Sequence, residues 1–463
     1  MAERFEIVEK TLLQMLESKK YTTLRDILIT MNPSDVAGIF NDLEEKQVPL
    51  MFRLLPKELA AETFVEMESD TQALLIQGFS DNELKEVLSE LYVDDAADLV
   101  EEMPATVVRR ILEQADPEMR SSINQILRYP ENSAGSIMTT EYVALRPTMT
   151  VEESIRRIRR QGVDKETIYT CYVIDTDRTL LGLVTVKDLL LCDDDETKIN
   201  DIMVTNLISV TTQDDQEEVA RMFSKYNFLA LPVVDKENRM VGIVTFDDAM
   251  DVMQDEATED MEIMAAITPS EKSYMASSPF ELFKHRIPWL MLLMVSATFT
   301  GMIISSFEES LGALPILTVF IPMLMDTGGN SGSQSSVTVI RALSLDELKF
   351  KYIFGVIWKE LRTAVLCGLV LAVLCFGKVM LVDRLLMGNP SVTVWVDVTV
   401  CLTLCVTVLV AKIVGCSLPL IAKRLGFDPA VMASPFITTI VDATSLLIYF
   451  ALASALIPAL HTV

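Results

Sequence analysis

The chain has 463 residues, and its 66 acidic and 39 basic residues give a formal net charge of −27. The excess of acidic residues lies in residues 1–279, which hold 55 acidic and 27 basic residues. Residues 280–463 hold 11 acidic and 12 basic residues and are rich in apolar side chains. An acidic half repels nucleic acid and anionic headgroups, so we expect neither to be its partner, and the length predicts two or more domains.

Residues 1–130 are predicted to form a series of short helices. The first ten residues lack the apolar core of a signal peptide, so we expect this half to stay in the cytoplasm. Similar openings recur at Met31, Leu55 and Phe79, each with a cap or proline, an acidic first turn and apolar residues at helical spacing. Repeats of this kind favour an all-α superhelical domain.

Three aspartates stand out near the end of this region. Asp94 and Asp98 are four residues apart, so on a helix they share one face and repel each other unless a cation lies between them. Asp95 lies beside them. An acidic first turn is also favoured by the helix dipole, so a purely structural explanation stays open.

Residues 131–253 contain two copies of one pattern. Ile137-Met138 recurs at Ile202-Met203, and Gly182-Leu-Val-Thr-Val-Lys-Asp188 recurs at Gly242-Ile-Val-Thr-Phe-Asp-Asp248. Each copy predicts a strand, a helix, an apolar strand, a turn, a strand and a helix. The repeat resembles a pair of α/β cystathionine-β-synthase (CBS) domains.

The CBS resemblance also implies a nucleotide site. In that family the Thr-x-x-Asp at the end of each copy often binds the ribose and phosphates of an adenine nucleotide. Asp188, with Lys187 beside it and Tyr169 on the neighbouring strand, could hold ATP in this way. An empty cleft with a structural role is the alternative.

An acidic connector is predicted over residues 254–283. We expect it to be helical to about Phe283, with Glu256, Glu259 and Asp260 on one face. A solvated acidic face is the simpler explanation. Because the segment leads into the apolar half, the same face could also meet the acids of the preceding domains.

The apolar half, residues 284–463, is predicted to form a five-helix membrane domain. Each span reaches the roughly 20 residues that a bilayer requires. Lys and Arg gather in the connections on the side of the N-terminus, which places the C-terminus outside. Lys412, inside the fourth span, could snorkel or pair with a carboxylate. The expected spans are roughly 287–306, 314–341, 363–382, 392–421 and 434–459.

The second and fifth spans carry polar groups in an apolar setting. Asp326 and Asn330 lie in the second, and Thr438 and Asp442 lie one turn apart in the fifth. A bilayer tolerates such groups where they face protein or a water-filled cavity. Their oxygen atoms suit a hard cation. These residues therefore predict the lining of an ion path.

With these parts in this order, the chain resembles the MgtE family of magnesium channels along essentially its whole length. The resemblance implies a homodimer in the cell membrane, with one pore on the two-fold axis. It also implies that Asp442 of both copies holds a hydrated Mg²⁺ and that cytosolic Mg²⁺ closes the pore. The motifs that match are Pro322, Asp326, Gly328, Gly329, Asn330, Gly332 and Gln334, then Pro435, Phe436, Thr438, Asp442 and Tyr449. The implied regulatory residues are Asp94, Asp95, Asp98, Glu217, Asp248, Asp251, Glu256, Glu259 and Asp260.

Two alternatives remain from the residues alone. A CBS-regulated carrier of Co²⁺ or Mn²⁺ would use similar oxygen ligands, whereas Zn²⁺ would favour softer ones. An intramembrane aspartyl protease could pair Asp326, in the tripeptide Asp-Thr-Gly, with Asp442. The acidic half would have no role in a protease, so we expect a transport protein and no enzyme activity.

Overall fold

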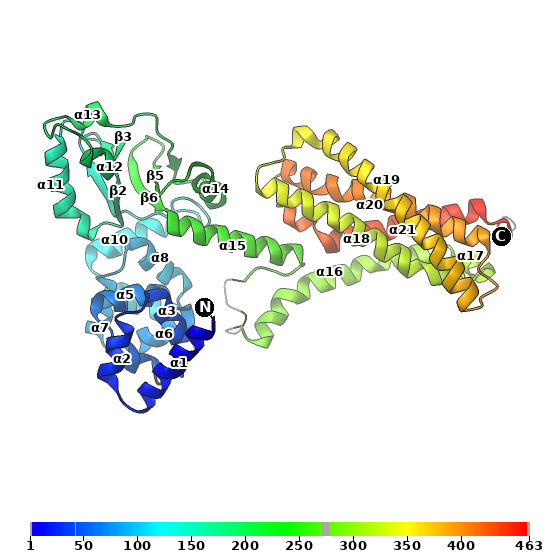
Figure 1. The fold of residues 1–463 in the computed structure, drawn as a ribbon, viewed down its shortest axis with the longest axis horizontal. Coiled ribbons are helices and arrows are strands. Elements are labelled where there is room, and N and C mark those ends of the chain that lie inside the picture. Colours follow the sequence, from blue (N-terminus) through cyan, green and yellow to red (C-terminus); the bar gives the residue numbers. More distant parts are fainter. Residues whose placement is uncertain (1, 42, 271–273, 275–276, 461–463) are drawn as a thin grey trace. The chain divides into compact units, whose positions relative to one another are not determined.

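The computed structural model describes residues 2–41, 43–270, 274 and 277–460. The chain forms two compact units, Met1–Asp255 and Glu256–Val463 (Figure 1). The first combines a stack of helices with two small sheets. The second is a bundle of long helices.

The N-terminal part of the first unit is a stack of short helices, as the sequence predicts. A chain of aromatic side chains forms its core, with ring centroids 6.3 Å apart for Phe40 and Phe52 and 5.2 Å apart for Phe52 and Phe79. Local caps fix several starts, such as the reciprocal hydrogen bonds of Ser80 and Glu83 at α7. The helices are α1 (Ala2–Glu17), α2 (Tyr21–Leu28), α3 (Pro33–Asn41), α4 (Val48–Phe52), α5 (Lys57–Val65), α6 (Ser69–Gly78), α7 (Asp81–Leu88), α8 (Val93–Glu102), α9 (Ala105–Gln114) and α10 (Pro117–Ile126).

The tandem repeat folds into two three-stranded sheets, with strand orders β1-β2-β3 and β4-β5-β6. In each, the first pair is parallel and the second antiparallel. The elements are β1 (Tyr142–Leu145), α11 (Val151–Gln161), β2 (Thr167–Ile174), β3 (Leu180–Thr185), α12 (Val186–Leu190), α13 (Ile199–Ile202), β4 (Val210–Thr211), α14 (Gln216–Tyr226), β5 (Ala230–Val234) and β6 (Met240–Thr245). The predicted pair of CBS domains is confirmed.

The repeated Ile-Met and Gly motifs are explained by contacts between the two copies. A Cβ atom on Gly182 would lie 2.9 Å from Met203 Sδ, and one on Gly242 would lie 2.9 Å from Met138 Sδ. The methionine of each copy therefore fills the space that the glycine of the other copy leaves. The duplicated sequence builds one reciprocal interface.

The acidic connector differs from the single helix expected up to Phe283. Helix α15 (Phe246–Met264) begins at the end of the second CBS copy and stops well before Phe283. Ala266 has a left-handed φ of 57°, which a continuing helix does not allow. A new helix, α16 (Pro279–Ser306), begins with a capping box of Ser278 and Glu281 and with Pro279 in its first turn. The connector is thus a helix followed by a turn.

The second unit contains the long helices. After α16 come α17 (Glu308–Ala313), α18 (Leu317–Ser344), α19 (Ile353–Lys378), a π-helical continuation (Val379–Leu386), α20 (Val394–Leu425) and α21 (Ser434–Leu456). Helix α20 packs against α18, α19 and α21, and α16 packs against α21. Figure 1 shows these helices lying lengthwise beside one another.

Among the described residues, four helical segments are long and apolar enough to cross a membrane, rather than the five expected. They are Pro279–Ser306, Phe350–Leu386, Val394–Leu425 and Pro429–Leu456. The expected second span is α18, which has 28 residues and is long enough. It is too polar to be counted among the membrane-length apolar helices, because it carries Asp326, Asn330 and several serines. Its apolar side chains pack within the bundle.

Candidate ion path and regulatory carboxylate cluster

Helix α18 presents a polar stripe on one face. Asp326, Asn330, Gln334 and Thr338 follow one another at intervals of four residues, and all four are exposed in the single chain. Asn330 Nδ2 donates a hydrogen bond of 3.1 Å to Asp326 Oδ1. The helix therefore divides into a polar exposed face and a face that packs within the bundle.

Helix α21 brings the other two predicted path residues beside this stripe. A Cβ atom on Gly329 would lie 2.9 Å from Thr438 Cγ2, so α18 and α21 approach closely at this point. Asp442, one turn after Thr438, is partly exposed, and its carboxylate is close enough to Asp326 for the two charges to repel. The structure thus brings together Asp326, Asn330, Thr438 and Asp442.

In the first unit, carboxylates gather where the start of α8 meets the start of α15. Asp94 is only 6% exposed, and its Oδ1 atom is buried without a hydrogen-bond partner in the described part of the chain. Burial and the charge of Asp248 hold the pKa of Asp94 well above its ordinary range. Asp248 accepts hydrogen bonds from Thr245 N and Thr245 Oγ1, yet burial still raises its pKa to about 6.

The other two aspartates of α8 belong to the same cluster. Loss of solvation, and then the charge of Asp248, raise the pKa of Asp95 to about 7 and that of Asp98 to about 8, although the Asp98 side chain is still exposed to solvent and Asp95 is half-buried. Carboxyl groups held this far from their ordinary pKa bind either protons or cations. The predicted grouping of Asp94, Asp95 and Asp98 with Asp248 is therefore seen in space.

Sequence reasoning missed Glu166, which stands directly before β2. Burial, and then Asp248, Asp247, Asp95 and Glu141, raise its pKa to about 8. Its Oε2 atom is also buried without a hydrogen-bond partner among the residues described. No spacing along the chain could have revealed it, because only the fold brings the start of β2 beside α8 and α15. We call Asp94, Asp95, Asp98, Glu166 and Asp248 the carboxylate cluster.

Of the other predicted regulatory residues, Glu217 lies away from the cluster, whereas the charge of Asp251 is among those that raise the pKa of Asp248. Glu217 on α14 forms an ion pair with Arg221 one turn later. Asp251 has its pKa raised by burial and by the charges of Asp255 and Glu66. Within the described residues, no three His, Cys, Asp or Glu side chains are already spaced to hold a metal ion. The cluster would have to tighten to coordinate one directly.

The acidic face of α15 reaches the path helix in the second unit. Ser344 Oγ, in the last turn of α18, donates a hydrogen bond of 3.2 Å to Asp260 Oδ2. Glu256, one turn earlier on α15, is partly buried, and Glu259, directly before Asp260, is exposed. Asp260 therefore contacts α18 directly.

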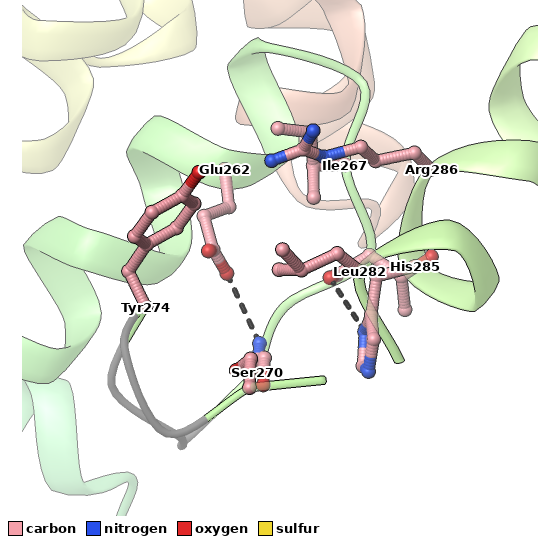
Figure 2. A pocket seen from close by; sticks show the side chains of 9 residues that line it. Glu262, Ile267, Ser270, Tyr274, Leu282, His285 and Arg286 are labelled. Carbon is pink, nitrogen blue, oxygen red and sulfur yellow. Dashed lines mark hydrogen bonds between the residues drawn. The ribbon is translucent and has the colours of Figure 1, made fainter. Parts of the chain in front are cut away.

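The turn after α15 is held onto α16 by hydrogen bonds around a cavity of about 100 Å³ (Figure 2). Ser270 N donates to Glu262 Oε2 at 3.0 Å. Thr268 N donates to His285 O at 2.9 Å, and His285 Nδ1 lies 3.0 Å from Thr268 O. These bonds tie the end of α15 to the second turn of α16.

The three predicted nucleotide residues lie near the end of β3. Thr170, next to Tyr169, pairs with Thr185 across β2 and β3. Asp188 Oδ2 accepts hydrogen bonds from Thr185 N at 3.1 Å and from Thr185 Oγ1 at 2.6 Å. Tyr169, Lys187 and Asp188 are all exposed. One Asp188 oxygen therefore caps α12, and the side chains around it are open to solvent.

An acidic unit with paired CBS domains, joined to a bundle of membrane-length helices with a polar stripe, is the architecture of a membrane ion transporter. The family model for the MgtE divalent cation transporter matches residues 321–452. The models for the MgtE intracellular N domain and the CBS domain match residues 31–132, and residues 134–193 and 199–255.

Full-length relatives agree with these matches. The magnesium transporter MgtE of Thermus thermophilus is 37% identical over 453 residues, which cover 97% of this chain and 98% of that protein. The magnesium transporter MgtE of Bacillus subtilis is 34% identical, with 96% of both chains covered. The chain belongs to the MgtE family of magnesium transporters.

Solved structures match the soluble unit. The cytosolic domain of the Mg²⁺ channel MgtE in complex with ATP has a TM-score of 0.50 and 38% identity, covering 53% of this chain and 99% of that one. The soluble part of a magnesium transporter gives a TM-score of 0.51 and 31% identity, covering 55% of this chain and 99% of that one.

Proposed function

We propose that the chain forms a homodimeric Mg²⁺ channel, in which α18 and α21 line the path and internal Mg²⁺ closes it through the carboxylate cluster. The first unit would lie in the cytoplasm and the C-terminus outside, following the positive-inside asymmetry. Domain limits near residues 130, 253 and 283 form part of this proposal.

The polar stripe of α18 supports the dimer. Asp326, Asn330 and Gln334 are exposed in one copy, although α18 is long enough to cross a membrane. Such groups need protein or water beside them in a bilayer. A second copy packed about a two-fold axis would enclose two stripes around one water-filled path.

The same residues suit a hydrated Mg²⁺ as substrate. Mg²⁺ gives up its water reluctantly and is usually held by one or two carboxylates. Asp442 of each copy would supply a charge, while Thr438 and Asn330 would hydrogen-bond to the water shell. Co²⁺ and Mn²⁺ are the alternative substrates, because oxygen ligands do not exclude them.

Gating is supported above all by one observation, the crowding of carboxylates with raised pKa around Asp248, of which Asp94 is buried and Asp98 is exposed. Ionised, these side chains repel one another and favour separation of α8 from α15. Bound Mg²⁺ would supply the positive charge that holds them together. Because Asp260 on α15 contacts Ser344 on α18, movement of α15 can reach the path.

A nucleotide is the second proposed ligand of the first unit. Tyr169, Lys187 and Asp188 would contact the adenine, the phosphates and the ribose of ATP. Their exposure and their closeness near the end of β3 support this assignment. The cytosolic domain of a related channel was crystallised with ATP, which supports the same ligand class.

The path assignment is tested by metal uptake into proteoliposomes. We expect Asp442→Ala and Asp442→Asn to lower Mg²⁺ uptake at least about tenfold, because each removes the charge that compensates for dehydration. Glu309→Gln, at an exposed position on α17, is the carboxylate control and should keep uptake. Unchanged uptake in both Asp442 variants would refute the assignment, and Co²⁺ or Mn²⁺ entry that outpaces Mg²⁺ would favour the alternative substrates.

A further inference from the structure

Three polar side chains from three helices meet inside the helix bundle of the second unit. Ser335 on α18 is 2% exposed and Lys412 on α20 is 5% exposed. Ser335 Oγ donates a hydrogen bond of 2.6 Å to Glu360 Oε2 on α19. Lys412 Nζ donates one of 3.3 Å to Ser335 Oγ and lies 3.9 Å from the same Glu360 oxygen. We call Ser335, Glu360 and Lys412 the buried triad.

The buried triad is not expected to add much to the free energy of unfolding. Taking two charges out of water costs free energy, and well-packed apolar residues often hold helices together equally well. Buried charges have directional hydrogen bonds, however, which apolar contacts lack. The triad is therefore better suited to fixing a relative orientation than to adding stability.

The triad stands beside the closest contact between α18 and α20. Next to the triad the two helices touch through their backbones, since a Cβ atom on Gly415 would collide with the carbonyl oxygen of Gly332. Small residues allow the two helices to approach this closely. The hydrogen bonds of Ser335 add a directional constraint beside this contact.

Ser335 is placed so that its bonds control the opposite side of α18. At about 100° per residue, the nine positions from Asp326 to Ser335 amount to about two and a half turns, which places Ser335 on the side of α18 opposite Asp326. Asn330, four positions from Asp326, remains on the side of Asp326. A rotation that broke the bonds of Ser335 would therefore turn Asp326 and Asn330 away from their positions beside α21.

We propose that the buried triad fixes the rotation of α18, which makes Glu360 and Lys412 positioning residues for Mg²⁺ binding in the path. The inference rests on the proposed path residues Asp326 and Asn330. The triad touches no transported ion. It acts by holding the polar stripe at one angle.

The test is a kinetic comparison in proteoliposomes, normalised to the amount of folded protein seen by size-exclusion chromatography. Lys412→Met keeps most of the side-chain volume but removes the charge and the hydrogen bond to Ser335. We expect the half-saturating Mg²⁺ concentration of uptake to rise at least about fivefold, as expected for a loosened site. Lys412→Arg, which keeps a charged donor, should restore it to within about twofold of the wild-type value.

Two further variants control for a general effect of mutating α20 and for misfolding caused by an unpaired buried charge. Ser417→Ala is the matched control, because the Ser417 hydroxyl donates to Ile413 O of its own helix at 2.6 Å, and it should keep the wild-type value. The double variant Lys412→Met with Glu360→Gln leaves no unpaired buried charge, so it should fold even if a single variant does not. It should still show the raised half-saturating concentration.

A lower maximal rate with a wild-type half-saturating concentration, in Lys412→Met or in the double variant, would overturn the inference. Asp326→Asn, measured in parallel, distinguishes a failure of the path assignment from a failure of the positioning role of the triad. If Asp326→Asn leaves uptake unchanged, the path assignment fails and the inference with it. If Asp326→Asn impairs uptake while the triad variants bind Mg²⁺ normally, the inference alone fails.

Discussion

Ser344 Oγ at the end of α18 donates a hydrogen bond of 3.2 Å to Asp260 Oδ2 on α15. One partner belongs to the acidic connector, and the other ends the helix that carries the polar stripe. Of the remaining acids of the α15 face, Glu256 lies one turn earlier and Glu259 directly precedes Asp260. The connector thus has a direct route to the proposed path, and its charge can influence the path helix without a longer chain of contacts.

Neutralising the connector should keep the channel open. We expect Glu256→Gln combined with Glu259→Gln to maintain Mg²⁺ conductance at internal Mg²⁺ concentrations that close the wild type. Without these charges, Mg²⁺ no longer favours the closed position of α15, and a shift of about 5.5 kcal/mol suffices to reverse a 1:99 population. Patch recordings test this, with Glu237→Gln in the CBS turn as the control. Closure of the double variant at the wild-type concentration would mean that the connector is only a solvated helix.

Glu166 should behave as a member of the regulatory site. Its burial beside Asp248 implies that Glu166→Gln removes one charge from the cluster without leaving a cavity. We expect the internal Mg²⁺ concentration for half closure to rise roughly threefold to tenfold, since affinity for hard cations depends on the number of charged ligands. Calorimetry on residues 1–255 provides an independent reading. Wild-type affinity in Glu166→Gln would exclude a role for this residue.

The first unit should lose stability as pH rises when Mg²⁺ is absent. The pKa values of Asp98 and Glu166 are raised to about 8, whereas free carboxyls titrate near about 4. Between these values the folded unit retains protons that the unfolded chain has released, so the free energy of unfolding falls as pH rises through this range. The loss is complete above about pH 8.

Thermal unfolding of residues 1–255 from pH 5 to pH 8 measures this effect. The midpoint should fall with pH in chelator and much less in millimolar Mg²⁺, because the cation replaces the protons. Asp98→Asn should reduce the slope. A midpoint in chelator that is constant or rises over this range would contradict the proposed repulsion within the cluster.

Asp188→Asn should weaken ATP binding. The amide can still accept the hydrogen bond from Thr185 N that begins α12, so the fold is kept while the charge that would hold the ribose hydroxyls is lost. We expect at least about a tenfold loss of affinity by calorimetry, since hydrogen bonds to a charged group contribute about 1.5–3 kcal/mol. Asp177→Asn, in an exposed turn, is the control. Equal ATP affinity of the two variants and the wild type would place the nucleotide elsewhere.

Local signals predicted most of the architecture. The tandem repeat predicts a helix after the first strand of each copy, and the structure has α11 at Val151–Gln161 and α14 at Gln216–Tyr226. The spacing of Asp94 and Asp98 correctly placed both in one cluster. These features are encoded within a few residues of each other, so they can be read without knowledge of the fold.

Features that depend on distant contacts could not be predicted in this way. The break after Met264 follows from a left-handed Ala266, a conformation that alanine does not favour on its own. Glu166 joins the cluster only because β2 begins beside α8. Lys412 was expected to snorkel or to find a carboxylate, but its partner Glu360 lies on another helix and no sequence spacing indicates the pair.

The most direct test of the account compares wild type with Asp94→Asn/Asp248→Asn in excised patches while internal Mg²⁺ is raised. Both substitutions keep side-chain volume and remove the two charges that face each other between α8 and α15. If Mg²⁺ bound at the carboxylate cluster closes the channel, the conductance of the wild type falls as internal Mg²⁺ rises. The double variant then needs at least about tenfold more Mg²⁺ for half closure. Equal half-closing concentrations in the two proteins would contradict it.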